Sequence, residues 1–379
     1  MPGDLAVDLR SLAAEVADEA LGLLAELTAL DAPSGDGEAL RAPADLLAGR
    51  LAELGGEVVR HGAQTGDHLE ARFSTAGGPA LMLLAHYDTV WPRGTAAARL
   101  LRAHGRVVYG PGVFDMHGGI AAALTALRLL RRLGLPERDV TVLVTADEET
   151  GSRTSADLVR ALGREAAAVL VPEPPLPGGV LKTARKGVAD FLLEVRGRAA
   201  HAGIDPERGA SAIHELADLV ARVERIARPE AGTTVNVGRI GGGTRLNVVA
   251  ETAWAEVEYR VRSAAEQARV EAELSALTPV REGVSITVEP LGARPPLERT
   301  PAIAAAFERA QELARPLGVE LREGTSGGAG DANLLGPLGV AVLDGLGPDG
   351  GGAHALDEHV RVDSLEERIA LLALLVARL

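Results

Sequence analysis

Acidic and histidine side chains follow several apolar runs of this sequence. His86 and Asp88 follow "PALMLLA", and Glu148 and Glu149 follow "VTVLVTAD". Residues two apart at a strand end project to the same side. Asp88 is therefore expected either to orient His86 or to be a weaker ligand beside it. Adjacent carboxylates repel each other at a half-buried strand end, where water screens them poorly. We therefore expect a cation near the two glutamates.

The pair Glu148 and Glu149 offers one carboxylate for a metal ion and one for proton transfer. A carboxylate beside a metal ion can take a proton from an attacking water and later give it to a leaving nitrogen. This division of roles is what hydrolysis of an amide requires. The spacing alone leaves open which glutamate has which role. The alternative is a solvated turn in which neither charge has a chemical role.

Three further residues could complete a metal site. Asp115 lies in the glycine-rich turn "YGPGVFDMHGG", where it is either a helix N-cap or a carboxylate that bridges two cations. Glu173 follows the run "AAAVLVP", and His354 lies in the loop "GGGAHALDEHV". With His86 and one of the glutamates these residues give five nitrogen and oxygen ligands. Such a set is enough for two zinc ions that share one carboxylate and keep a position open for water.

The ligands are expected at one edge of a sheet. The chain contains several continuous apolar runs of strand length, which alternate with helical patterns such as residues 118–133. Such runs are typical of strands buried on both faces of a mostly parallel sheet with flanking helices, an α/β fold. In these folds ligands bind beyond the carboxyl ends of the strands. That is where His86, Glu148 and Glu173 would lie.

The length of 379 residues predicts two domains, because one hydrophobic core usually stops growing at about 250–300 residues. Two Pro/Gly-rich joints, 172–179 and 291–301, bracket a segment with the order βαββαβ, which is the ferredoxin-like α+β pattern. We expect an inserted domain over 181–292. The catalytic domain would comprise 1–180 and 293–379.

Composition limits the partners and the available chemistry. The formal charge of −14, from 39 basic and 53 acidic residues, argues against nucleic acid and anionic membranes as partners. The sequence has no cysteine, which excludes thiolate ligands and thiol nucleophiles. The N-terminus reads as an amphipathic helix rather than a signal peptide, and no uncharged run reaches the ~18 residues of a membrane span. A soluble, cytoplasmic protein is expected.

Seven motifs resemble, in the same order, the aminoacylase, succinyl-diaminopimelate desuccinylase and glutamate carboxypeptidase family of zinc metallopeptidases. They are HxDxV at 86–90, "GPGVFDMHGG" at 110–119, "DEETGS" at 147–152, "PEP" at 172–174, "GRAAHAG" at 197–203, "GGAGDAN" at 327–333 and "GAHALDEHV" at 352–360. Each motif alone is weak, but seven in register are specific. The resemblance covers nearly the whole chain, and the glutamate carboxypeptidase branch is the most similar.

The resemblance implies a role for each ligand. Asp115 would bridge two zinc ions, His86 and Glu173 would complete one site, and Glu149 and His354 would complete the other. Glu148 would be the general base and Asp88 would orient His86. Cobalt or manganese could replace zinc, because they accept similar ligands. A cis peptide bond after Asp115 is also frequent in relatives, and His117 stands where they often have Lys or Asp.

The resemblance also implies that 181–292 is a lid and the interface of a homodimer. His201 would stabilise the oxyanion of the tetrahedral intermediate, within its own subunit or across the dimer. Asn247 matches the lid asparagine of the family. Arg294 matches the arginine that binds the free carboxylate of the substrate, a group that a planar guanidinium suits.

The expected activity is hydrolysis of an amide next to a free carboxylate, in a small peptide or an N-acyl amino acid. A carboxypeptidase that releases a C-terminal amino acid, with glutamate suspected, comes first, and an N-acyl amino acid deacylase is the alternative. Lys182, Arg185 and Lys186 could attract an acidic side chain or be exposed lid charges. A remote alternative is a serine hydrolase, since "GTSGG" would make Ser326 the nucleophile and His354 its base, with an acid such as Asp331 or Asp344.

Overall fold

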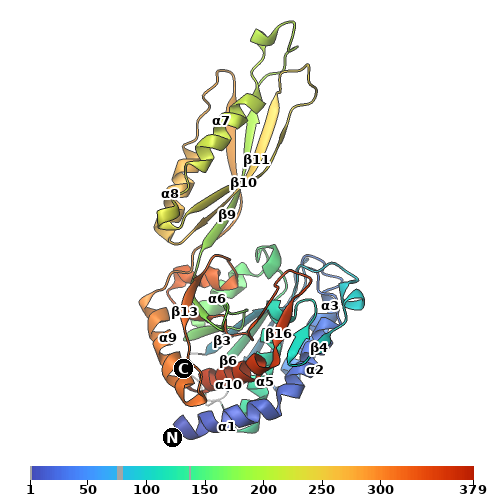
Figure 1. Ribbon diagram of the computed structural model, residues 1–379, viewed down its shortest axis with the longest axis vertical. Coiled ribbons are helices and arrows are strands. Elements are labelled where there is room, and N and C mark those ends of the chain that lie inside the picture. The colour runs from blue at the N-terminus through green and yellow to red at the C-terminus, as the bar shows by residue number, and fades with distance from the viewer. Residues whose placement is uncertain (1, 75–79, 136–137) are drawn as a thin grey trace. The chain divides into compact units, whose positions relative to one another are not determined.

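The chain divides into two compact units. The computed structural model describes residues 2–74, 80–135 and 138–379 (Figure 1). Unit 1 comprises Met1–Ala184, Arg299–Ser326 and Gly330–Leu379, and unit 2 comprises Arg185–Glu298 and Gly327–Ala329. The expected insertion, 181–292, differs from unit 2 by a few residues at each end. At the first boundary, Lys182 pairs with Asp344 in the sheet of unit 1.

An eight-stranded sheet forms the centre of unit 1, in the order β1-β2-β6-β3-β7-β14-β8-β13. The strands are β1 Glu57–His61, β2 His68–Phe73, β3 Leu81–His86, β6 Val140–Thr145, β7 Ala168–Val171, β8 Leu181–Arg185, β13 Glu323–Ser326 and β14 Ala341–Asp344. The strands β6, β3, β7 and β14 run parallel to one another. At one edge, β2 pairs antiparallel with β6, and β1 pairs antiparallel with β2. The expected mostly parallel sheet is confirmed.

The central strands are buried on both faces, as their continuous apolar sequences predict. All six residues of β3 and all six of β6 are buried. In β3, Leu81, Leu83 and Ala85 join the large core cluster on one face, and the intervening Met82 and Leu84 face the other side. Packing on both faces therefore supports the strands up to their ends.

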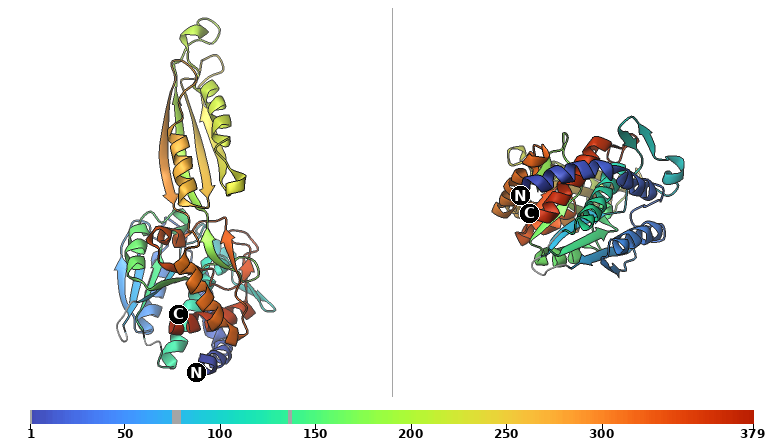
Figure 2. Two further views of the ribbon diagram at one scale, coloured as in Figure 1. Left: turned by 90° about the vertical axis from the view of Figure 1, so that its left-hand side faces the viewer. Right: turned by 90° about the horizontal axis from the view of Figure 1, so that it is seen from below.

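Helices flank this sheet (Figures 1 and 2). The helices of unit 1 are α1 Pro2–Glu15, α2 Ala17–Thr28, α3 Arg41–Glu53, α4 Thr95–Ala98, α5 Gly118–Arg132, α6 Ala156–Glu165, α9 Pro301–Ala314 and α10 Val362–Arg378. The helix expected at the N-terminus is divided into α1 and α2 at Val16. Helix α9 starts where its sequence predicts, because the Thr300 hydroxyl accepts from the Ile303 amide and Pro301 occupies the first turn.

A small second sheet in unit 1 joins two loops that the site uses. It comprises β4 Arg102–His104, β5 Val107–Tyr109, β15 Gly350–Gly351 and β16 His359–Arg361. Strand β16 pairs with both β5 and β15. The loop between β15 and β16 is thereby fixed beside the segment that follows β5.

Unit 2 has the predicted ferredoxin-like order βαββαβ. Its elements are β9 Gly187–Arg196, α7 Ala212–Glu224, β10 Thr234–Gly242, β11 Thr252–Val261, α8 Ala264–Ser275 and β12 Ser285–Arg294. The strands form an antiparallel sheet in the order β10-β11-β9-β12, and both helices cover one face of it (Figures 1 and 2). Burial alternates along β9 and β11, because only that face packs against the helices.

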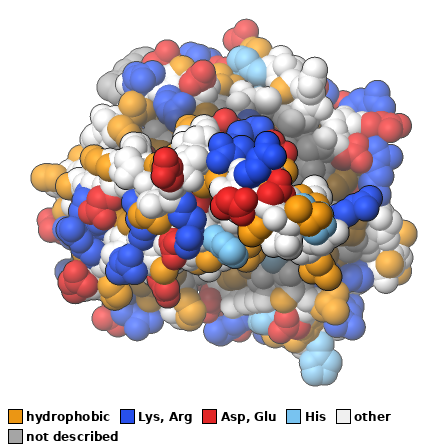
Figure 3. Space-filling view, turned by 90° about the horizontal axis from the view of Figure 1, so that it is seen from above, with side chains coloured by type: hydrophobic (Ala, Val, Ile, Leu, Met, Phe, Trp, Pro, Cys, Tyr) orange, Lys and Arg blue, Asp and Glu red, His pale blue; other side chains and the backbone are white. Residues whose placement is uncertain are grey.

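The most apolar helical segment and the surface charges bear on the predicted partners. Among the described residues, Val113–Arg132 is the segment with the length and composition of a membrane span, but 89% of its most apolar window is buried inside the protein. Burial of this kind is typical of a core helix. Figure 3 shows acidic and basic side chains interspersed on the face seen from above.

Candidate metal centre

The predicted ligands lie in unit 1 at the carboxyl edge of the parallel strands. His86 is the last residue of β3, Glu149 follows β6, and Glu173 follows β7. Because β3 pairs in parallel with both β6 and β7, the three strands end at the same edge. Asp115 lies in the turn Val113–His117 before α5, and His354 lies in the loop between β15 and β16.

The first group of ligand atoms is His86, Asp115 and Glu173, all within 4.8 Å of one another. The imidazole Nε2 of His86 lies 3.3 Å from Asp115 Oδ1 and 3.2 Å from Glu173 Oε1. His86 and Glu173 are buried. We call these residues the buried triad.

The second group is Asp115, Glu149 and His354, again within 4.8 Å. Nε2 of His354 lies 3.4 Å from Asp115 Oδ2 and 3.0 Å from Glu149 Oε1. We call these residues the exposed triad, because the side chain of His354 is 48% accessible. The two oxygens of Asp115 thus face different histidines, which is the arrangement of a carboxylate that bridges two ions.

The hydrogen bonds of His86 fit a metal ligand. Its Nδ1 lies 3.0 Å from the backbone oxygen of Asp88, an acceptor, so Nδ1 carries a proton and Nε2 is the nitrogen that can bind an ion once its own proton is displaced. Nε2 is buried and makes no hydrogen bond of ordinary geometry, although carboxylates surround it. A divalent cation between these atoms satisfies both the lone pair and the carboxylates. The donor set of imidazole and carboxylate suits zinc.

Asp88 also organises the turn that carries the two glutamates. Its carboxylate accepts hydrogen bonds from the amides of Glu148 at 3.1 Å and Glu149 at 3.2 Å, and from the Ser34 hydroxyl at 2.6 Å. The carboxylate is 3.5 Å from His86 Nδ1, farther than the Asp88 backbone oxygen. The side chain of Asp88 therefore links His86 to the Glu148–Glu149 turn rather than serving His86 alone.

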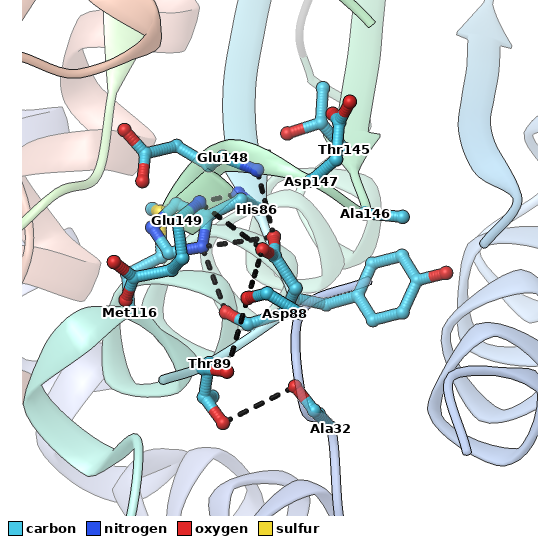
Figure 4. Close-up of polar contacts among 12 residues, drawn as sticks. Ala32, His86, Asp88, Thr89, Met116, Thr145, Ala146, Asp147, Glu148 and Glu149 are labelled. Carbon is cyan, nitrogen blue, oxygen red and sulfur yellow. Dashed lines mark hydrogen bonds and ion pairs between the residues drawn. The ribbon is translucent and has the colours of Figure 1, made fainter. Parts of the chain in front are cut away.

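The side chains of the three adjacent acids Asp147, Glu148 and Glu149 point in different directions, which reduces the repulsion between their charges. The carboxylate of Asp147 is buried and accepts from the Thr154 amide and from the Thr154 and Ser155 hydroxyls. Figure 4 shows the side chains of Glu148 and Glu149 diverging, with Asp88 between their amides. Glu149 joins the exposed triad, and Glu148 belongs to neither triad. The charge of Glu148 nevertheless acts on His86, which indicates that the two are close.

The pKa shifts show that the site favours positive charge. Burial lowers the pKa of His86, but Asp115, Asp88 and Glu173 outweigh burial and raise this pKa well above its ordinary value. Asp115 and Glu149 raise the pKa of His354 to about 10. Burial raises the pKa of Glu149, and repulsion from Asp115 adds to the shift. In the metal-free protein two protons therefore partly compensate the carboxylates, and a metal ion can take their place.

Two residues that support the site, Glu358 and Asp331, were not predicted in that role. Glu358, four residues after His354, is fully buried and accepts hydrogen bonds from the turn that carries Asp115. Asp331 is buried and accepts from the hydroxyls of Thr145 and Ser152, on either side of the two glutamates. Both carboxylates lie within quoted motifs, but their partners are distant in sequence.

Three predicted residues lie in unit 2, where two of them are neighbours. His201 and Asn247 are exposed, and the amide of Ala202 donates to the backbone oxygen of Asn247 at 3.0 Å. Arg294, the last residue of β12, pairs with Val188 near the start of β9. The His201 segment follows the other end of β9. Arg294 and His201 are therefore separated by roughly 25 Å of strand at about 3.3 Å per residue.

The lysines and arginine near β8 are not equivalent. Lys182 is buried, and its Nζ lies 3.4 Å from Glu173 Oε2, so it contacts a ligand of the buried triad. Arg185 is buried and donates to the backbone oxygens of Gly328 and Ala329. These contacts contradict the alternative that the two are exposed lid charges. Lys186 is partly exposed.

The contacts of His354 disagree with a serine hydrolase. Its Nε2 faces Asp115 and Glu149. Of the two possible acids for a triad, Asp331 accepts from Thr145 and Ser152, and Asp344 accepts from the Gly345 amide. The groups that would activate Ser326 are thus engaged elsewhere.

Comparisons with known proteins agree with this geometry. Residues 82–378 match the profile of the peptidase family M20/M25/M40. The chain is 30% identical over 365 residues to carboxypeptidase G2 of a Pseudomonas species, covering 93% of this chain and 87% of that protein. It is 32% identical over 384 residues to the succinyl-diaminopimelate desuccinylase of Stenotrophomonas maltophilia, covering 95% and 98%.

Solved structures share the fold. A tripeptidase from Staphylococcus aureus superposes with a TM-score of 0.76 at 23% identity, covering 96% of this chain and 99% of the other. An M20 family metallo-carboxypeptidase from Sulfolobus solfataricus gives a TM-score of 0.73 at 16% identity, covering 95% and 98%.

Proposed function

Because this chain belongs to the peptidase family M20/M25/M40 and is a metallohydrolase, we propose that it hydrolyses an amide bond next to a free carboxylate. The preferred activity is that of a carboxypeptidase which releases a C-terminal amino acid, with glutamate as the first candidate. The alternative within the family is an N-acyl amino acid deacylase. One observation carries the proposal: Asp115 directs one oxygen to each of two ligand groups.

The cofactor that we propose is a pair of zinc ions, the usual metal of the family. The buried triad would hold one ion and the exposed triad the other, with Asp115 shared. When bound, the ions supply Lewis acidity, which polarises the scissile carbonyl and acidifies the attacking water. Cobalt or manganese suits the same ligands.

Glu148 is the proposed general base. It takes the proton of the attacking water and gives it to the leaving nitrogen. Its side chain is buried, and Asp88 fixes its amide, so the carboxylate is held beside the triads without belonging to either. This arrangement supports the assignment of Glu149 as ligand and Glu148 as base.

The substrate carboxylate would bind Arg294, and His201 would stabilise the oxyanion. The separation of Arg294 and His201 within unit 2 supports a homodimer in which one subunit supplies His201 and Asn247 to the site of the other. Strand β10 is an edge of the sheet of unit 2, and its residue Ile240 is 64% exposed, which suits pairing with a second copy. We place the enzyme in the cytoplasm, with small peptides or N-acyl amino acids as substrates.

The test is a release assay on a panel of C-terminal dipeptides and N-acyl amino acids, with and without chelator. We expect release of the amino acid to require zinc. In Glu148→Gln release should fall at least about 10³-fold while bound zinc stays unchanged, because general base and proton shuttle are lost together. Asp157→Asn, an exposed change on α6, is the matched control and should keep full activity. Failure of the zinc-loaded protein on the whole panel would overturn the proposal.

A second experiment tests the exchange of residues between subunits. His201→Ala and Glu148→Gln are each expected to be inactive. Subunits that are mixed and reassembled should regain activity, because one site of each mixed dimer receives His201 from one chain and Glu148 from the other. Absence of recovery, with mixed dimers confirmed by light scattering and mass spectrometry, would place His201 in its own subunit.

A further inference from the structure

Glu358 is a carboxylate that accepts four hydrogen bonds beside the metal centre. Its Oε1 accepts from the amides of Phe114 at 3.0 Å and Asp115 at 3.1 Å, and its Oε2 accepts from the amide of Gly112 at 2.8 Å and from Trp91 Nε1 at 2.9 Å. The side chain is fully buried. Four donors thus converge on one carboxylate.

The turn that Glu358 contacts cannot satisfy these amides by itself. Asp115 and Met116 have non-helical φ and ψ angles, and Gly112 adopts φ +71°, so the regular amide-to-carbonyl ladder of a helix is interrupted. Buried amides without an acceptor are costly. A carboxylate accepts several amides at once and, being charged, binds them more strongly than a neutral oxygen does.

The four donors tie together three segments, each of which carries a metal ligand. Trp91 lies five residues after His86, and the turn contains Asp115 itself. Glu358 lies four residues after His354 in the same loop, which the Gly110 amide also contacts through the Glu358 backbone oxygen. His86 has the independent support of a buried strand, but Asp115 and His354 lie on loops.

We propose that Glu358 is a positioning residue that sets the separation between Asp115 and His354, and therefore the affinity of the exposed triad for its metal ion. The inference rests on the proposed two-metal function. Glu358 touches neither substrate nor metal, and it acts through the backbone of the turn and of the His354 loop. Its loss should weaken the exposed triad more than the buried triad.

The test is Glu358→Gln, which keeps the shape of the side chain but leaves only one oxygen that can accept hydrogen bonds. Zinc affinity is measured by chelator competition, and the geometry of the site by the visible absorption spectrum of the cobalt-loaded protein. We expect the weaker of two zinc-binding steps to lose roughly 10- to 100-fold in affinity, the range typical of residues that support metal ligands. The cobalt spectrum should change, and kcat should fall more than KM rises at saturating zinc.

Glu215 offers a matched control in unit 2. It is also fully buried, and it accepts from the amides of Val280 and Arg281, both at 2.9 Å. Glu215→Gln should lower the melting temperature but leave zinc affinity and the cobalt spectrum unchanged. Trp91→Phe removes a single donor to Glu358 and should give a smaller change in the same direction, which keeps the inference testable if Glu358→Gln does not fold.

The outcomes are distinct. If both Glu358→Gln and Trp91→Phe keep zinc affinity within about twofold and the cobalt spectrum of the wild type, Glu358 is merely structural and the inference is wrong, while the proposed function stands. If the wild-type protein binds no zinc, the proposed function itself fails. A loss that affects both binding steps equally would also contradict the specific role in the exposed triad.

Discussion

The two triads share one carboxylate but are built differently. His86 of the buried triad ends a strand that is buried on both faces, and its side chain is 2% accessible. His354 of the exposed triad lies in a loop at φ +62°, and its side chain is 48% accessible. A regular sheet fixes the first histidine, whereas hydrogen bonds within and between loops must fix the second. The buried triad should therefore bind its ion more tightly and release it more slowly.

The largest effect is expected from Asp115→Asn, because Asp115 belongs to both triads. An amide offers one oxygen and no charge, so it cannot bridge two cations. Release of the amino acid should fall at least about 10³-fold, as expected when charge stabilisation at a reaction centre is lost. Metal analysis after dialysis should show less than one ion per chain. Retention of two ions would contradict the sharing of Asp115.

Next in size is the difference between His86→Ala and His354→Ala. Loss of His86 removes the imidazole that Asp115 and Glu173 share, at a buried position where water replaces it poorly. The zinc affinity of His86→Ala should fall by more than roughly 100-fold. The zinc affinity of His354→Ala, where water can take the place of the ring, should fall by roughly 10- to 100-fold. Chelator competition separates the two variants. Equal losses, or a larger loss in His354→Ala, would remove the distinction between the triads.

A smaller and graded change in zinc affinity is expected when the pH is varied. In the metal-free protein the pKa of His354 is about 10, because Asp115 and Glu149 favour the protonated ring. Zinc must displace this proton, so affinity at the exposed triad should rise as pH increases towards 10. Calorimetry in buffers of different ionisation enthalpy should show proton release on binding at pH 7. Binding without proton release would contradict the assignment of His354 as a ligand.

The raised pKa of His354 also affects the stability of the metal-free protein. A folded-state pKa above the unfolded value of about 6.5 means that protonated His354 stabilises the fold. This contribution is fully present below about pH 6.5 and is lost as pH rises through about 10. His354→Gln should abolish this part of the pH dependence in denaturant unfolding.

The smallest effect is expected from Ser34→Ala. The Ser34 hydroxyl donates to Asp88, which also holds the amides of Glu148 and Glu149. Removal of one donor should lower kcat/KM by less than about tenfold, the size of about one ordinary hydrogen bond, because both amides still hold Asp88. A loss as large as that of Asp88→Ala would show that Ser34 has a role beyond supporting Asp88.

Much of the fold could be predicted because its signals are local. The apolar runs at 81–86 and 140–145 form buried parallel strands, and the βαββαβ order of unit 2 is as the alternating patterns indicate. The N-terminal helix was the less accurate case. Its periodicity continues through Val16, where the structure divides it into α1 and α2.

The supporting roles of Glu358 and Asp331 could not be predicted, since their partners are remote in sequence. Glu358 contacts amides 243 to 246 positions away, and Asp331 contacts hydroxyls 179 and 186 positions away. Asp147 stands in the same motif as Glu148 and Glu149, but its carboxylate turns back to Thr154 and Ser155. Residue type indicates which side chains can bind a metal, whereas the fold decides which of them converge.

The most direct test of the account is anomalous X-ray diffraction at the zinc edge on crystals of protein purified without chelator. The account predicts two peaks on either side of Asp115, one beside His86 and Glu173 and the other beside Glu149 and His354. Partial removal of zinc should weaken the second peak first. A map with no peak at Asp115, or with a single ion that contacts both histidines, would contradict the two-metal centre.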